Sequence, residues 1–159
     1  KEATDALKLV QLELNKKGLG LKIYDGYRPQ RAVNHFYKWA LDVNDTLMKQ
    51  QFYPNELKQN LFKKGYIASK SGHTRGSTLD VTLIDLKTGT ALDMGFSYDF
   101  FGQESWVVFD ELIVKQKENR SQLQKAMLTH GFKNYPQEWW HFTLINEPYP
   151  DTYFDFVVE

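Results

Sequence analysis

The sequence of 159 residues contains no cysteine. Disulfide bonds and metal sites built from thiolates are therefore excluded, and any metal ion has to be held by histidine, aspartate or glutamate side chains. The absence fits the cytoplasm, where disulfides are rare, and it fits the periplasm equally well. Cysteine content therefore does not assign a compartment.

The chain also lacks an excess of charge of either sign. Lysine and arginine together number 20, aspartate and glutamate together number 20, and the isoelectric point is about 7.1. A nucleic acid or an anionic membrane surface is consequently not an expected partner. Apolar runs are only a few residues long, which is too short for a membrane-spanning segment.

What the sequence does contain is enough apolar material for a folded core. Hydrophobic residues make up 42% of the chain and aromatic residues 15%, a composition that argues against disorder. We find no internal repeat and no low-complexity linker. The length and this uniformity predict one domain over residues 1–159.

Apolar periodicity predicts a mixture of helices and strands. The expected helices cover residues 3–16, 30–48, 55–64 and 119–130, and the expected strands cover residues 21–27, 78–85 and 139–145. This mixture indicates an α+β fold with a small, mostly antiparallel sheet flanked by helices. Residues 95–110 are rich in aromatic side chains but not periodic, so we expect a long loop, a feature that is often functional in compact domains.

Two of the four histidines stand in contexts that suggest metal binding. His35 lies within a predicted helix and His130 at a helix end, where ordinary surface or packing roles suffice. His73 instead lies in a loop rich in serine, glycine and threonine, Asp80 is on the polar face of the next strand, and His141 enters an aromatic strand. Asp80 could equally face solvent, but two histidines and one aspartate make three nitrogen and oxygen ligands, the number that a catalytic zinc ion takes while one position stays open for water.

Two charged residues could complete a hydrolytic site. Glu138 lies three positions before His141, and a free carboxylate beside a metal can accept a proton from water. Residues three apart in a regular strand face opposite sides, so we expect the strand entry after Pro136 to be bent. Arg28, held extended by Pro29, is either a surface charge or a donor aimed at a developing oxyanion.

Five segments together resemble the VanX-type D-alanyl-D-alanine dipeptidases, zinc enzymes of the wider D,D-peptidase and Hedgehog-like metallopeptidase group. They are residues 24–29 (YDGYRP), 69–76 (SKSGHTRG), 80–83 (DVTL), 138–141 (EWWH) and the tail 147–156, and they follow one another in the order typical of the family. The resemblance therefore extends along most of the chain. It implies a Hedgehog/D,D-peptidase-like fold and hydrolysis of a small D,D-dipeptide, in cell-wall dipeptide turnover or in glycopeptide resistance.

The resemblance also implies a role for each site residue. It places one zinc ion on His73, Asp80 and His141, a general base at Glu138, stabilisation of the tetrahedral intermediate at Arg28, and binding of the substrate's free amino group at Ser71 and Asp99. Members of this family carry an N-terminal stretch, with tyrosines that line the dipeptide pocket, ahead of the helix with which this chain opens. We therefore expect a catalytic domain without that stretch and with a less enclosed pocket.

Two other functions stay open at this stage. A D,D-carboxypeptidase acting on peptidoglycan stem peptides would use the same metal and base in a more open cleft. A zinc-binding module without catalysis would not need Glu138 or Arg28, so the presence of both favours an enzyme. The sequence indicates neither the oligomeric state nor the compartment, although between periplasm and cytoplasm we favour the periplasm.

Overall fold

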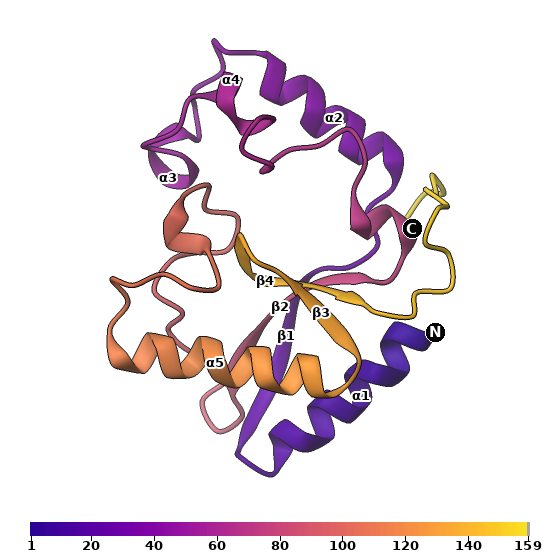
Figure 1. Cartoon of the computed structure of the whole chain (residues 1–159), viewed down its shortest axis with the longest axis vertical. Helices are drawn as coiled ribbons and strands as arrows, with labels where there is room; N and C mark the ends of the chain where they lie inside the picture. The colour runs from indigo at the N-terminus through magenta and orange to yellow at the C-terminus, as the bar shows by residue number, and fades with distance from the viewer. Residues whose placement is uncertain (159) are drawn as a thin grey trace.

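The computed structural model describes residues 1–158 as an α+β fold around a four-stranded antiparallel sheet (Figure 1). Its helices are α1 (Glu2–Asn15), α2 (Gln30–Leu41), α3 (Lys49–Phe52), α4 (Lys58–Leu61) and α5 (Val114–Thr129), with two short 3-10 helices, η1 (Gly72–Arg75) and η2 (Gln103–Ser105); its strands are β1 (Leu19–Asp25), β2 (Thr78–Asp85), β3 (Phe132–Tyr135) and β4 (Glu138–Leu144). The predicted fold class is confirmed.

The strands are ordered β1-β2-β4-β3, and all neighbours are antiparallel. In this order β2 and β4 are the central strands, although some fifty residues separate them in the chain. Their register pairs Asp80 directly with His141. Side chains that face each other across an antiparallel pair lie about 5 Å apart at Cβ, so the register alone brings two predicted metal ligands together.

Several predicted boundaries were wrong, each for a local reason. The second helix ends at Leu41 instead of residue 48, because the Asp42 side chain accepts the N–H of Asn44 and the buried ammonium group of Lys58 binds the carbonyl oxygens of Trp39 and Asp42. Side-chain groups that take over backbone hydrogen bonds in this way commonly stop a helix.

The last helix begins earlier than predicted, and one strand was missed. Helix α5 starts at Val114, where the Gln116 side chain accepts the N–H of Ile113 and so replaces a lost helical partner. Strand β3 has only four residues and follows Gly131 directly. So short a segment carries too few alternations to be recognised from periodicity.

Two separate hydrophobic clusters hold the molecule together. The larger one lies between the sheet and helices α1 and α5, which pack on each other, and it takes in Val81 and Leu83 of β2 together with Trp140 of β4. The smaller cluster joins α2, α3 and α4 to the loop that contains Phe101. Asp80 immediately precedes Val81 on β2, so its side chain points away from the larger core, toward the space between the clusters.

The C-terminal segment, residues 147–156, connects the start of α2 to η1. In Figure 1 this yellow segment runs beside η1 and the start of α2. Phe154 donates its N–H to the carbonyl of Thr74 and accepts the N–H of Gln30, each over 3.0 Å. Within residues 1–158, no helix is both long and apolar enough to cross a membrane.

Candidate metal centre and substrate pocket

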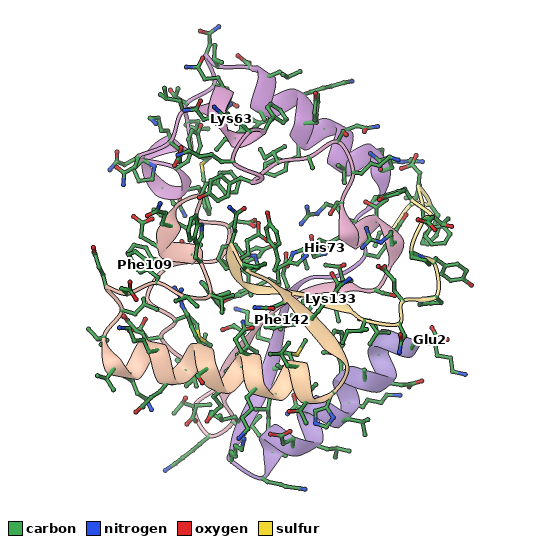
Figure 2. All side chains as sticks on the ribbon, in the orientation of Figure 1. Glu2, Lys63, His73, Phe109, Lys133 and Phe142 are labelled. Atoms are coloured by element: carbon green, nitrogen blue, oxygen red, sulfur yellow. The ribbon has the colours of Figure 1, made fainter. Side chains whose placement is uncertain are left out.

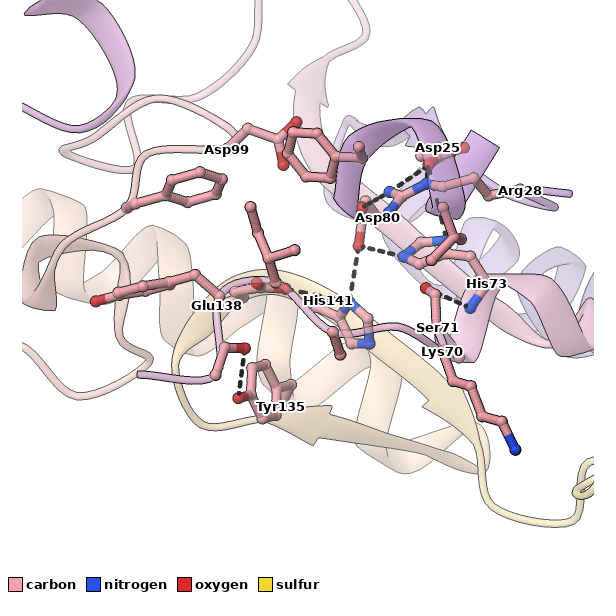
Figure 3. A pocket seen from close by; sticks show the side chains of 18 of the residues that line it. Asp25, Arg28, Lys70, Ser71, His73, Asp80, Asp99, Tyr135, Glu138 and His141 are labelled. Carbon is pink, nitrogen blue, oxygen red and sulfur yellow. Dashed lines mark hydrogen bonds and ion pairs between the residues drawn. The ribbon is translucent and has the colours of Figure 1, made fainter. Parts of the chain in front are cut away.

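Three side chains converge on one point at the centre of the pocket (Figure 3). His73 Nε2 lies 3.3 Å and His141 Nδ1 lies 3.1 Å from Asp80 Oδ1. One ligand atom from each of the three residues lies within 4.8 Å of the other two, so the group could hold a metal ion. The sequence prediction of these three residues as one cluster therefore agrees with the geometry.

His73, which lies near the middle of the molecule in Figure 2, is held by two hydrogen bonds, one to its backbone N–H and one to its ring. Its N–H is accepted by the Ser71 side chain over 3.3 Å, which fixes the first turn of η1. Its ring Nδ1 lies 2.8 Å from the carbonyl oxygen of Gly26. A carbonyl accepts only from a protonated nitrogen, so the lone pair of the neutral ring is on Nε2, the atom that faces Asp80.

Asp80 is the buried centre of the cluster. It is 2% exposed, and its Oδ2 accepts a hydrogen bond from the hydroxyl of Tyr98 over 3.1 Å. Among the described residues, Oδ1 has no hydrogen-bond donor, because neither imidazole nitrogen approaches with hydrogen-bond geometry. Burial raises the pKa of Asp80, but His141 and His73 outweigh it and hold the pKa below its usual range. An ionised oxygen without a donor, between two imidazole nitrogens, is a suitable environment for a cation.

Glu138 reaches the same point because β4 is irregular. The β3–β4 pairing passes from Asn134↔Phe142 directly to Tyr135↔Glu138, so three residues of β4 have no counterpart in β3. This bulge turns the start of the strand and places Glu138 Oε2 3.2 Å from His141 Nδ1. The bent strand entry expected from the sequence is confirmed. Burial lowers the pKa of His141, but its contacts with Asp80 and Glu138 outweigh burial and raise the pKa to about 9.

Arg28 faces the cluster from the end of β1. Asp25 Oδ2 accepts from its Nε over 2.8 Å and from its Nη2 over 2.6 Å, so one carboxylate oxygen fixes the plane of the guanidinium group. The Nη2 atom is also 3.9 Å from Asp80 Oδ2. Of the two interpretations of Arg28 that the sequence left open, the structure favours a group within the site.

Asp99 and Ser71 line the same pocket from different sides. Asp99 lies across the cavity from Arg28 and has a φ of 60°, a left-handed conformation that is uncommon outside glycine. Burial and the nearby charge of Asp80 raise the pKa of Asp99 to about 7. Ser71 lies at the start of η1, where its hydroxyl oxygen already accepts the His73 N–H, so its own proton is available to another acceptor.

The pocket has a volume of about 550 Å³, and all seven predicted site residues line it. Two further residues with evident roles were not predicted. Asp25, which holds Arg28, lies in the first quoted segment but was given no function, and Tyr98, which binds Asp80, directly precedes Asp99. In both cases a neighbouring residue had been singled out, and that proximity in sequence was the available signal.

Comparison with known proteins identifies the relatives of this chain. Residues 1–159 match the D-Ala-D-Ala dipeptidase family of peptidases. A D-alanyl-D-alanine dipeptidase of Enterococcus faecalis is 45% identical over 153 residues, which is 96% of this chain and 76% of that protein. Another of Enterococcus faecium is 44% identical over 90% of this chain and 71% of its own length, and one of Streptomyces coelicolor is 42% identical over 96% and 76%.

We expect the protein to bind one divalent metal ion per chain and the His73→Ala variant to lose it, since only two of the three converging ligand atoms would remain. Elemental analysis after dialysis against metal-free buffer measures this. His35→Ala is the matched control, because His35 is exposed on α2 and lies outside the pocket. A full equivalent of metal in His73→Ala would show that His73 is not a ligand.

Proposed function

This chain belongs to the D-Ala-D-Ala dipeptidase family of metallopeptidases, and we propose that it hydrolyses the free dipeptide D-Ala-D-Ala to two molecules of D-alanine with the help of a bound zinc ion. The observation that carries the proposal is the convergence of His73, Asp80 and His141 in a pocket that also contains a free carboxylate and a fixed guanidinium group. The biological setting would be turnover of cell-wall dipeptides or glycopeptide resistance.

The three converging residues suit zinc in number and in chemistry. His73 would contribute Nε2, His141 would contribute Nδ1, and Asp80 would contribute the buried oxygen that has no hydrogen-bond donor. Nitrogen and oxygen donors from three protein residues are the usual set of a catalytic zinc site, which keeps one position open. A zinc ion there supplies Lewis acidity, which activates water and polarises a carbonyl group.

Glu138 is the group placed to move protons. It lies beside His141 but outside the three-residue cluster, and it is only partly buried, so its carboxylate can reach both water and substrate. We assign it the role of general base toward the attacking water. The same carboxyl group then donates the proton to the leaving amine nitrogen, which would otherwise depart as an unstable anion.

Arg28 is the group placed to stabilise negative charge on the substrate. Asp25 fixes the guanidinium plane, so its N–H groups are oriented before substrate arrives. A donor that is already oriented stabilises the oxyanion of a tetrahedral intermediate without a reorganisation cost. Asp25 itself acts through Arg28 in this scheme, as a positioning residue.

Asp99 and Ser71 would recognise the free amino terminus of the dipeptide. Asp99 has a raised pKa because it is buried near Asp80. A substrate ammonium group would supply the missing counter-charge and favour the ionised carboxylate. The required positive charge on the substrate distinguishes a free dipeptide from the acylated end of a longer stem peptide.

Replacing Glu138 by alanine should abolish turnover and leave the metal in place. We expect a fall in kcat of about 100-fold or more, the usual contribution of a general base. Steady-state kinetics on D-Ala-D-Ala, together with zinc analysis, measure both quantities. A kcat close to that of the unmodified protein would mean that another group accepts the proton.

Replacing Arg28 by lysine should fail to restore activity although the charge is kept. Lysine offers one mobile ammonium group, whereas Asp25 holds the arginine fork in a fixed plane. We expect kcat to fall by about 100-fold with little change in KM, because the contact strengthens in the transition state. If KM rises while kcat is unchanged, Arg28 binds the ground state and our assignment is incorrect.

The preference for a free amino group should depend on pH. Above a pKa of about 7, Asp99 is ionised and an acylated substrate leaves it without a partner; below that pH it is protonated and the penalty disappears. One pH unit above the pKa corresponds to about 1.4 kcal/mol. We therefore expect kcat/KM for D-Ala-D-Ala to exceed that for N-acetyl-D-Ala-D-Ala about tenfold at pH 8, with little difference at pH 6.

Asp99→Asn is the control for this measurement and should show no such change between pH 6 and pH 8. Equal kcat/KM values for the two substrates at pH 8 in the unmodified protein would favour the D,D-carboxypeptidase function over the dipeptidase. Absence of turnover on both, with zinc bound, would favour the non-catalytic zinc module.

A further inference from the structure

A buried arginine on α5 lies outside the metal site but holds the loop that forms one wall of the pocket. Arg120 is 2% exposed, and three of its guanidinium N–H groups bind backbone carbonyl oxygens. Nε donates to Met94 over 2.7 Å, Nη2 to Glu104 over 2.8 Å, and Nη1 to Trp106 over 2.6 Å. A single planar group therefore fastens both ends of residues 94–106, which we call the pocket loop.

The chemistry of this contact is unusual for a structural arginine. Its hydrogen-bond acceptors are neutral carbonyl oxygens, and a buried cation without a hydrogen-bonded carboxylate is costly. Burial accordingly lowers the pKa of Arg120 to about 10, an effect that Asp93 partly offsets, so the side chain stays charged near neutral pH. Its guanidinium carbon also lies 5.7 Å from the ring centre of Trp139, the residue after Glu138.

The neighbouring polar residues of α5 strengthen the same attachment. Asn119 donates to the carbonyl of Asp93 over 2.8 Å, and the Gln116 amide donates to the Asp93 carboxylate over 2.9 Å. Gln124 reaches the carbonyl of Trp139 on β4 over 3.0 Å. Gln116, Arg120 and Gln124 follow one another at intervals of four, and Asn119 lies three positions after Gln116. All four therefore share one face of α5, which binds the pocket loop, the residue before it and the start of β4.

The pocket loop carries groups that the site requires in fixed places. Tyr98 donates to Asp80 and stacks on Tyr24 with 4.5 Å between ring centres. Phe101 is buried in the smaller core. Between them, Asp99 adopts its left-handed backbone conformation, which persists only where the surrounding structure determines it. The loop has little regular structure of its own, so its shape depends on how its ends are held.

We propose that Arg120 is a positioning residue for substrate selection: by fastening both ends of the pocket loop, it holds Asp99 where a substrate ammonium group binds. The effect on substrate selection rests on the proposed dipeptidase function. The statement that Arg120 holds both ends of the pocket loop does not depend on that function. Lysine at this position would keep the charge but could not direct three N–H groups at carbonyls from both loop ends.

The first test measures the loop itself in metal-free protein, by hydrogen exchange of backbone amides. In Arg120→Lys we expect peptides that cover residues 94–106 to exchange about tenfold faster, with β2 and β4 unchanged. Leu123→Ala is the matched control, because Leu123 is fully buried on the same helix but belongs to the larger core. That variant should lower the melting temperature without singling out the pocket loop.

The second test measures selection by the zinc-loaded enzyme at pH 8. In Arg120→Lys we expect KM for D-Ala-D-Ala to rise about tenfold, kcat to change less, and the preference over N-acetyl-D-Ala-D-Ala to disappear. Leu123→Ala, assayed well below its melting temperature, should keep the preference. A loss of preference in both variants would reduce Arg120 to a general stabilising role and overturn the proposal.

The two tests separate the proposal from the function on which it rests. Unchanged exchange of the pocket loop in Arg120→Lys overturns the positioning role whatever the enzyme hydrolyses. An unmodified protein that does not hydrolyse D-Ala-D-Ala overturns the function but leaves the exchange result intact. If Arg120→Lys does not fold, Arg120→Gln is measured instead, because a neutral amide has one donor nitrogen and cannot bind carbonyl oxygens at both loop ends. Unchanged exchange of residues 94–106 in that variant overturns the proposal equally.

Discussion

One buried carboxylate determines how this site is built. Asp80 is almost completely removed from water, and an isolated charge at such a position would be unfavourable by several kcal/mol. It is tolerated because two imidazole rings and one tyrosine hydroxyl surround it, and each comes from a different part of the chain. The register of β2 against β4, the short helix η1 and the pocket loop are therefore mutually dependent, since each supplies a partner to the same group.

The three converging residues could be singled out from chemistry and sequence context, and the resemblance to the dipeptidase family supported them; Ser71 and Asp99 were indicated by that resemblance alone. His73, Asp80 and His141 have ligand side chains, and the alternation along β2 indicated that Asp80 points away from the larger core. The fold class followed from apolar periodicity in long elements such as α1 and β2, where the signal extends over enough residues to be reliable.

What could not be predicted depends on contacts between distant segments. The bulge that turns Glu138 toward His141 arises in the pairing of β3 with β4, and β3 is too short to be recognised alone. Arg120 reads in the sequence as one more charge on a polar helix. Its burial becomes evident only when the pocket loop folds across α5 and presents carbonyl oxygens at three places.

The contacts of the C-terminal segment have a consequence for biosynthesis. Phe154 is hydrogen-bonded on one side to Thr74, next to His73, and on the other to Gln30, close to Arg28. His141 and Phe154 are translated long after their partners, which are Asp80 for His141 and Thr74 and Gln30 for Phe154. The buried polar groups of the early segments therefore stay in contact with water during synthesis. The three converging side chains can come together only after translation has passed His141, and the contacts of Phe154 with η1 and α2 form later still.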